Sequence, residues 1–356
     1  MLITLISFVV VLGVVVFVHE FGHFAAAKLM GARVEAFSIG FGKLFGFKKG
    51  DTEYRIGYIP LGGYVKISGM VDEFMEDGGG IEGKPWEFQS KSTPAKMLMI
   101  TAGVIMNFIL GFMIYTGITL FEGKPVADES AIIGTVAEDY PAFEAGLQPG
   151  DRVLAIDGVE AADWNTFRDL VRLRANQDTE IRWISGSDTL TATVVPREEQ
   201  IVEDEQILAV GMIGVGPQVV YQPAGLGTAI VAGAQSTWNI IDLSIQSVGM
   251  LIRGDASVKD LTGPAGIVYL SGQTARAGWV SFISFIAFIS ISIGFLNILP
   301  FPVLDGGHLV YILIEAIIRR PVSTKVKIVL QQVGMALLLI LVLVVTYHDI
   351  LRFFVG

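Results

Sequence analysis

Four long apolar runs divide the chain and predict its architecture. The first 18 residues carry no charged side chain, and the first apolar run, which includes Ala25, Ala26 and Ala27, covers residues 1–27. Further runs occupy residues 97–121, 280–318 and 329–354. A helix needs about 20 mostly apolar residues to cross a bilayer. We therefore predict a polytopic α-helical membrane protein with four transmembrane helices. The third should be broken, because its run is too long for one straight span and contains the proline-rich NILPFPVLDGG.

The segment between the first two spans, residues 28–96, shows strand-like alternation. Residues 38–47 (SIGFGKLFGF) and 54–70 (YRIGYIPLGGYVKISGM) are rich in glycine and aromatic side chains. Pro60 and the paired Gly62 and Gly63 predict a tight hairpin. We expect a membrane-associated β hairpin or small sheet here, on the cytoplasmic side.

Residues 124–197 are predicted to form a soluble α+β domain inserted between the second and third spans. A short helix precedes a Pro-Gly-Asp turn, the strand RVLAI, an Asp-Gly turn and an amphipathic helix, and alternation returns at TEIRWI and TLTATVV. Residues 198–279 are expected to be an acidic linker followed by a helix over residues 226–252. The polar face of that helix suits the membrane interface better than a crossing.

Composition supports a membrane protein and excludes several other classes. The 356 residues are 52% hydrophobic and 17% charged, whereas soluble domains carry about 25% charged residues. The net charge of −10 and the lack of a basic run argue against a nucleic-acid partner. Cysteine is absent, so neither disulfides nor thiolate ligands are available.

Charge asymmetry predicts the orientation in the membrane. The loop between the last two spans carries four basic residues, namely Arg319, Arg320, Lys325 and Lys327. Short basic loops stay cytoplasmic, so the N-terminus and the acidic soluble domain should lie outside. HEFGH in the first span and LDGG in the third then reach comparable depth near the cytoplasmic side. Glu315 is expected to pair with Arg319 across one helical turn.

The first span carries the motif HExxH. His19 and His23 stand four residues apart, so they share one face of a helix. Paired imidazoles at this spacing hold zinc, and the intervening carboxylate of Glu20 acts as a general base on water. Polar side chains inside an apolar span are costly and point to function. The alternatives for Glu20 are a ligand role or an ion pair with Lys28.

A catalytic zinc commonly has three protein ligands, and Asp305 in the broken third span is the candidate for the third. Its alternative is to cap a helix that restarts at His308. His308 itself is a spare ligand, a hydrogen-bond donor behind the ligands, or a polar residue at a helix start. Asn297 either binds an unwound substrate backbone or ties helices together. In the second span, Gly103 and Asn107 are interpreted as a packing face.

The segment around Gly62, Gly63 and Tyr64 could hold a substrate. A transmembrane helix must be opened before its backbone can be cut, and a strand edge can bind an extended segment by main-chain pairing. The alternative is a purely structural sheet.

These motifs together resemble one family, the site-2 proteases, which are zinc intramembrane metalloproteases, and in particular its bacterial RseP-like branch. The resemblance rests on HEFGH, SIGFG, IPLGGYVKISG, GVIMN, LTGPAGI and NILPFPVLDGGH, and the block PAFEAGLQPGDRVLAIDG is similar to a PDZ domain. It implies that His19, His23 and Asp305 ligate zinc and that Glu20 is catalytic. Asn297 would help to hold the substrate, and the hairpin would re-enter the membrane. One PDZ block is visible, where the RseP-like pattern has two.

The predicted function is therefore that of an intramembrane zinc metalloendopeptidase in a bacterial inner membrane. The resemblance implies substrates that are single-span membrane proteins, such as anti-sigma factors or remnant signal peptides, cut in regulated intramembrane proteolysis. Its other partners would be the lipid bilayer and peptide C-termini or segments at the PDZ domain, which could act as a size filter. One alternative is a catalytically inactive metal-binding scaffold that recruits partners through this domain. A zinc transporter would need more intramembrane acids or histidines than this single cluster.

Overall fold

The computed structural model of the protein describes residues 2–70, 82–203, 206–257, 259 and 261–355. The chain forms two compact units. Unit 1 comprises Met1–Thr119 and Leu226–Gly356, and unit 2 comprises Leu120–Gly225.

The helices of unit 1 include the four predicted spans. In the described residues, four helices are long and apolar enough to cross a membrane: Leu2–Leu29, Thr93–Glu122, Trp279–Ile298 and Thr324–Phe353. The helices of this unit are α1 (Leu2–Leu29), α2 (Thr93–Glu122), α5 (Leu226–Arg253), α6 (Pro264–Ala277), α7 (Trp279–Ile298), α8 (Asp305–Ile318) and α9 (Thr324–Ile350). A 3-10 turn (Phe88–Ser90) precedes α2 and a π turn (Leu351–Val355) follows α9. The sequence pattern predicted one helix within residues 198–279, so α6 is an additional helix that this pattern did not predict.

The spans bury one side against each other and leave large apolar side chains exposed on the other. Val11 and Val15 of α1 pack with Phe285 and Ile286 of α7 in one buried cluster. By contrast, Leu343 on α9 is 69% exposed. Continuous apolar exposure of this kind is unfavourable in water, and it suits helices that are solvated by lipid chains.

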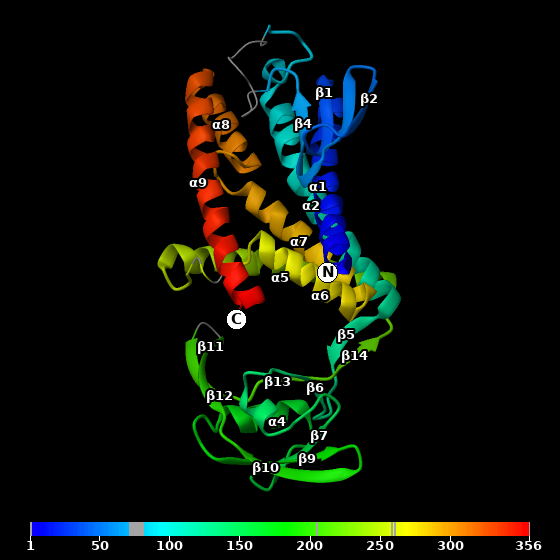
Figure 1. Cartoon of the computed structure of the whole chain (residues 1–356), viewed down its shortest axis with the longest axis vertical. Helices are drawn as coiled ribbons and strands as arrows, with labels where there is room; N and C mark the ends of the chain where they lie inside the picture. The colour runs from blue at the N-terminus through cyan, green and yellow to red at the C-terminus, as the bar shows by residue number, and fades with distance from the viewer. Residues whose placement is uncertain (1, 71–81, 204–205, 258, 260, 356) are drawn as a thin grey trace. The chain divides into compact units, whose positions relative to one another are not determined.

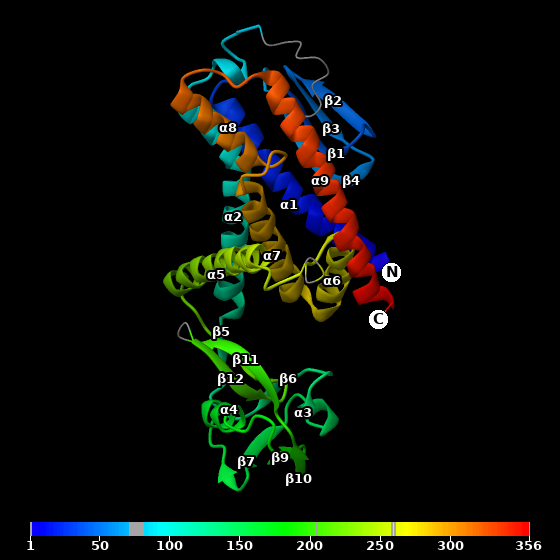
Figure 2. The same ribbon diagram turned by 90° about the vertical axis from the view of Figure 1, so that its left-hand side faces the viewer.

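A four-stranded sheet follows α1, in the order β2-β3-β1-β4. Its strands are β1 (Val34–Phe41), β2 (Phe45–Lys49), β3 (Thr52–Ile56) and β4 (Ile59–Ile67). Strand β1 is parallel to β3 and antiparallel to β4. In Figures 1 and 2 the sheet lies at the same end of unit 1 as the second half of α1 and the first turns of α2.

The tight hairpin predicted at Pro60, Gly62 and Gly63 is wrong. The hairpin connects β2 to β3, and all three residues lie inside β4. Because β4 is the last strand in the sheet order, the missing N–H of proline is tolerated there. Glycine in a strand interior marks a close approach by another part of the chain, and the next subsection identifies the residue that approaches Gly63.

The chain is not helical between α7 and α8. Helix α7 ends at Ile298 and α8 starts at Asp305, with Leu304 as its N-cap. The alternative in which Asp305 caps a helix restarting at His308 is therefore wrong. A Cβ atom at Gly306 would lie only 2.2 Å from the carbonyl oxygen of Leu299. The connecting segment therefore folds tightly over the first turn of α8, which requires glycine at this position.

Unit 2 contains the predicted α+β domain. It comprises β5 (Lys124–Ala127), β6 (Ile133–Val136), α3 (Pro141–Glu144), β7 (Arg152–Ile156), β8 (Val159–Glu160), α4 (Trp164–Arg172), β9 (Thr179–Ser185), β10 (Asp188–Val194), β11 (Arg197–Glu203), β12 (Gln206–Met212), β13 (Val215–Pro217) and β14 (Val219–Gln222). One sheet has the order β10-β9-β7-β8. Phe167, Ile181 and Trp183 are almost fully buried in its core.

The segment expected to be an acidic linker after residue 197 is instead part of unit 2. Strands β11 and β12 pair as an antiparallel hairpin, β13 pairs with β6, and β14 pairs with β5. Strands β13 and β14 satisfy the backbone hydrogen-bonding groups of β6 and β5. This pairing does not depend on the acidic side chains of the preceding hairpin. The compact unit consequently extends to Gly225.

Candidate metal centre

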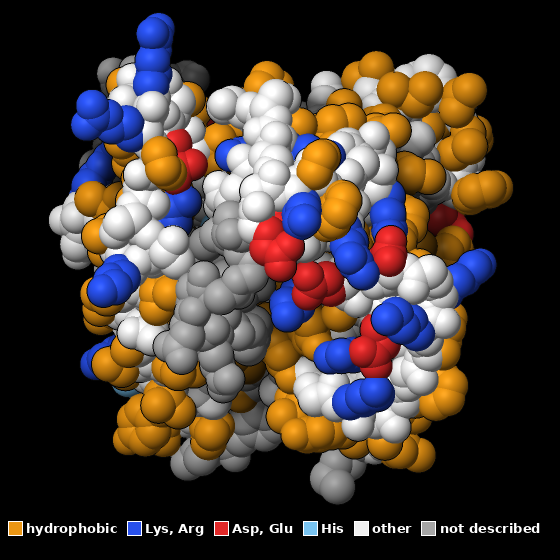
Figure 3. Space-filling model, turned by 90° about the horizontal axis from the view of Figure 1, so that it is seen from above, with side chains coloured by type: hydrophobic (Ala, Val, Ile, Leu, Met, Phe, Trp, Pro, Cys, Tyr) orange, Lys and Arg blue, Asp and Glu red, His pale blue; other side chains and the backbone are white. Residues whose placement is uncertain are grey.

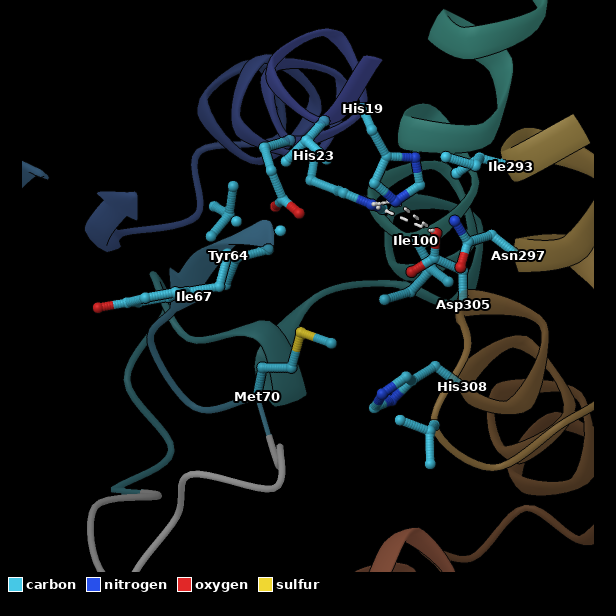
Figure 4. Close-up of a pocket in the computed structure, with 16 residues that line it drawn as sticks. His19, His23, Tyr64, Ile67, Met70, Ile100, Ile293, Asn297, Asp305 and His308 are labelled. Carbon is cyan, nitrogen blue, oxygen red and sulfur yellow. Dashed lines mark hydrogen bonds and ion pairs between the residues drawn. The ribbon is translucent and has the colours of Figure 1, made fainter. Parts of the chain in front are cut away.

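Three side chains from two distant segments converge in unit 1. His19 and His23 come from one face of α1, and Asp305 is the first residue of α8. The two Nε2 atoms lie 3.2 Å apart. Asp305 Oδ2 lies 3.3 Å from His19 Nε2 and 3.4 Å from His23 Nε2. Figure 4 shows the three groups pointing toward one another.

This donor set fits a single metal ion. Ligands that bind tetrahedral zinc at about 2.0–2.1 Å lie about 3.3–3.4 Å from one another, and the three observed separations run from 3.2 to 3.4 Å. Asp305 Oδ2 is also a buried atom that accepts no hydrogen bond in the described part of the chain. A buried polar atom without a partner is costly, and a cation between the three groups would remove that cost.

Hydrogen bonding fixes the ring of His23. Its Nδ1–H donates to the backbone carbonyl of Met99 on α2 at 2.8 Å. With the proton on Nδ1, the Nε2 lone pair is free and faces the cluster. Metal-binding histidines are commonly oriented in this way by a carbonyl or a carboxylate.

His19 is oriented by Asn107, also on α2. The Asn107 amide lies 3.4 Å from His19 Nδ1, and the residue is fully buried. Its Oδ1 has no hydrogen-bond partner in the described residues. The oxygen and nitrogen of an amide are assigned from their hydrogen bonds. The amide orientation that directs Oδ1 to Nδ1–H satisfies both groups and leaves His19 Nε2 free, as in His23.

Gly103 provides the space that His23 occupies. A Cβ atom on this residue would lie 2.3 Å from His23 Nε2. Met99, Gly103 and Asn107 are spaced four residues apart, so they form one face of α2. The predicted packing face of α2 is therefore also the support of the two histidines.

Sequence reasoning missed this supporting role. Met99 acts through its backbone carbonyl, which side-chain identity does not reveal. The sequence feature that could have revealed this role is Asn107, because a polar side chain inside an apolar span points to a function.

A cavity of about 300 Å³ opens beside the three donors. Glu20 lines it, and so do all the predicted substrate-binding residues, Gly62, Gly63, Tyr64 and Asn297. Asn297 comes from the end of α7 and lies beside Asp305 (Figure 4). The structure thus brings every residue predicted for the site to one cavity.

The β4 backbone lies directly against Glu20. A Cβ atom on Gly63 would lie 3.0 Å from Glu20 Cγ and 2.7 Å from the carbonyl oxygen of Ser38. Glycine at this position thus allows strand and helix to approach closely. Neither alternative for Glu20 is favoured, because Lys28 donates to Thr52 at 2.9 Å instead and the metal-ligand cluster consists of His19, His23 and Asp305.

His308 lines the same cavity but stands apart from the three donors. Its Nε2 lies 3.2 Å from the side-chain nitrogen of Gln331 on α9. The cluster of possible metal ligands found among the described residues does not include it. This contact supports the interpretation of His308 as a polar residue near a helix start.

Comparison with known proteins gives a consistent result. The family model described as "Peptidase family M50" matches residues 7–341. A putative zinc metalloprotease of Clostridium perfringens is 35% identical over 338 residues, which cover 94% of this chain and 95% of that protein. One from Agrobacterium fabrum is 34% identical, covering 97% and 95%. The regulator of sigma-W protease RasP from Bacillus subtilis is 29% identical, covering 99% of both chains.

A solved structure also matches part of the chain. It is the PDZ domain of the SdrC-like protein from Listeria monocytogenes, with 21% identity and a TM-score of 0.20. The match covers 27% of this chain and 92% of that domain.

Proposed function

The chain belongs to peptidase family M50, the site-2 protease family, and we propose that it cuts single-span membrane proteins within or beside their transmembrane segments. It is a zinc metalloprotease, as its relatives are named. The observation that carries the proposal is the meeting of His19, His23 and Asp305 next to Glu20 in a cavity between membrane-spanning helices.

His19, His23 and Asp305 would hold the zinc ion. Two neutral imidazoles and one carboxylate leave a position for substrate, as in other catalytic zinc sites. Zinc in such a site supplies Lewis acidity that polarises the carbonyl group of the scissile bond. The chain's own contribution is to fix both histidine tautomers through the Met99 carbonyl and the Asn107 amide.

Glu20 is proposed as the general base and acid. It lines the cavity and follows directly after the first histidine of the donor set. Its carboxylate would take a proton from the attacking water and return that proton to the nitrogen of the leaving amine. The backbone of β4 at Gly63 limits the movement of this side chain.

The edge of β4 is proposed to bind the substrate as an extended strand. Strand β4 pairs with β1 on one side and is the outermost strand in the sheet order. Its Gly62, Gly63 and Tyr64 line the same cavity as Asn297. Main-chain pairing along this edge would keep a substrate unwound beside Glu20, and Asn297 would bind its backbone from the opposite side.

The proposed orientation places the metal centre near the cytoplasmic face of a bacterial cell membrane. The basic loop that joins α8 to α9 favours that side, and the relatives are bacterial proteins. The N-terminus and unit 2 would then lie outside. One relative carries the name "Regulator of sigma-W protease RasP". That name is compatible with substrates that are membrane-bound regulators.

Unit 2 is proposed to be a PDZ domain that binds peptide segments. It has a cavity of about 220 Å³ beside α4, lined by Phe167 and Val171 of that helix and by Ile213 and Val215. Such a groove suits an extended peptide. The unit would admit substrates whose outer part has already been shortened.

The decisive experiment compares Glu20→Gln with Glu122→Gln in the full-length protein, reconstituted in vesicles with a single-span substrate. Removal of a general base should lower the cleavage rate by roughly 10²- to 10⁴-fold. Zinc should remain bound, because Glu20 is not one of the three donors. Glu122 is exposed at the end of α2, and its substitution should leave the rate unchanged.

The same preparations test the roles of the donors. Asp305→Asn should lose zinc as well as cleavage. Undiminished cleavage by Glu20→Gln would refute the base role. Zinc binding without cleavage in the original protein would favour a metal-binding scaffold. Loss of zinc from Glu20→Gln would instead make Glu20 a ligand.

A further inference from the structure

A second cavity, of about 470 Å³, lies where the first turn of α2, the end of α8 and the first turn of α9 meet. It shares no lining residue with the cavity at the metal centre. The proposed hydrolysis makes no use of it. Its charged and hydroxyl-bearing side chains include Lys96, Glu315, Arg319, Arg320, Thr324 and Lys327.

The carboxylate of Glu315 in the cavity lining is already paired. Glu315 Oε1 accepts from Lys327 Nζ at 2.7 Å and from the backbone N–H of Val322 at 3.0 Å. The two charged side chains are only 14% and 11% exposed. The predicted pairing of Glu315 with Arg319 is therefore wrong, because the carboxylate bonds to α9 rather than to its own helix.

Three cations remain in the cavity. In the part of the chain that the structure describes, no ion pair is found for Lys96, Arg319 or Arg320. The lining thus has an excess of positive charge that calls for an anion. Seen from above, Lys and Arg side chains are present on the side where α8 and α9 stand in Figure 1, as well as on the opposite side (Figure 3).

The backbone at Arg319 also points to a role for its side chain. Arg319 ends α8 in the left-handed conformation, with φ of 54°. Glycine or asparagine usually occupies this position at the end of a helix, and other residues rarely adopt the conformation. Arg319 therefore occupies a conformation that residues other than glycine and asparagine adopt rarely, and its side chain lines the cavity.

The position in the membrane selects the kind of anion. The cavity lies at the ends of two helices that are long and apolar enough to cross a bilayer, α2 and α9. Beside the cavity, Ile317 near the end of α8 is 80% exposed and Val329 in the second turn of α9 is 55% exposed, which suits contact with acyl chains. Basic pockets between transmembrane helices bind anionic lipid headgroups.

We propose that this cavity binds the phosphate group of an anionic phospholipid, with Lys96, Arg319 and Arg320 as its partners. Arginine binds phosphate oxygens through two parallel N–H donors. The buried ion pair of Glu315 and Lys327 forms part of the same lining. This inference depends on the membrane-spanning helices and not on the peptidase activity, so it can fail while the proposed function stands.

The test measures lipids retained by the full-length protein after its release from vesicles of equal parts phosphatidylglycerol and phosphatidylcholine, by native mass spectrometry. The original protein should retain phosphatidylglycerol preferentially. Each cation removed should lower this preference about fivefold, so Arg319→Gln combined with Arg320→Gln should lower it roughly 25-fold. Lys325→Gln is the matched control, because this exposed lysine lies close by in the first turn of α9 and does not line the cavity.

Two further variants separate binding from misfolding. Arg319→Lys keeps the charge and should keep most of the preference, whereas Lys96→Gln removes a cation from a different helix and should lower it. Equal retention of both lipids by the original protein would overturn the proposal. An equal loss in Lys325→Gln would also overturn it, since general surface charge would then be the cause. Displacement of the lipid by millimolar inorganic phosphate would show a site for free phosphate instead.

Discussion

Gly103→Ala tests how closely α2 must approach the metal centre. The added methyl carbon would lie 2.3 Å from His23 Nε2, whereas nonbonded heavy atoms require roughly 3.5 Å. The nitrogen would have to move by about 1.2 Å, while metal sites tolerate deviations of about 0.2 Å in ligand distance. We therefore expect zinc affinity to fall by roughly 100-fold, and cleavage to fall at least as much.

This loss cannot come from a weaker helix. Alanine stabilises a helix interior by about 1 kcal/mol relative to glycine, so α2 itself should form more readily in the variant. Gly117→Ala is the matched control, because the same change on the same helix meets no atom within 4 Å. Zinc content is measured by chelator competition on the purified protein, and cleavage on a single-span substrate in vesicles.

Equal zinc affinity and cleavage in the Gly103→Ala and Gly117→Ala proteins would refute the reasoning. It would mean that α1 and α2 can separate without disturbing the histidine, and that the support of His23 by α2 is unimportant.

Two further predictions concern the metal centre, and a third concerns the ion pairs of Glu53 in the sheet of unit 1. Asn107→Leu should lower zinc affinity roughly 10- to 100-fold in chelator competition, because it removes the group that orients His19. Gly63→Ala should lower the cleavage rate about tenfold with zinc retained, because the added methyl group would press on the side chain of Glu20 in α1. Hydrogen bonds from Arg55 and then Lys43 hold the pKa of Glu53 at about 2, so Lys43→Gln should raise that pKa in an NMR titration. Because the folded pKa lies below the ordinary value of 4.5, these bonds stabilise the β2–β3 hairpin above about pH 4.5 and are lost as the pH falls toward 2.

Each of these has a clear opposing result. Zinc binding by Asn107→Leu that equals the original would show that His19 needs no partner at Nδ1. Loss of zinc in Gly63→Ala would show that the strand supports the metal and not the base. A Glu53 pKa that stays at about 2 in Lys43→Gln would assign the whole shift to Arg55.

The parts of this protein that could be predicted are those encoded locally. HExxH fixes the spacing of His19 and His23 on any helix, and apolar runs of bilayer length define the spans. Asp305 could be matched to them because charge asymmetry predicts the depth of both segments, although Asp305 comes 282 positions after His23.

The parts that failed depend on tertiary contacts. Pro60, Gly62 and Gly63 look like turn residues, yet glycine occurs at position 63 because α1 lies against the strand. The acidic stretch from Glu198 looks like a linker, but it forms β11 of a hairpin with β12. The strands that follow, β13 and β14, pair with β6 and β5 from the start of the unit. Glu315 finds its partner on another helix for the same reason.

The separation of the donors has a consequence for synthesis of the protein. His19, His23 and Glu20 enter the membrane first, and at about 5–20 residues per second the ribosome reaches Asp305 on the order of 15 to 60 s later. During that interval the nascent polypeptide has only two of the three proposed donors. Incomplete molecules left in the bilayer by stalled translation would therefore be unable to cut their neighbours.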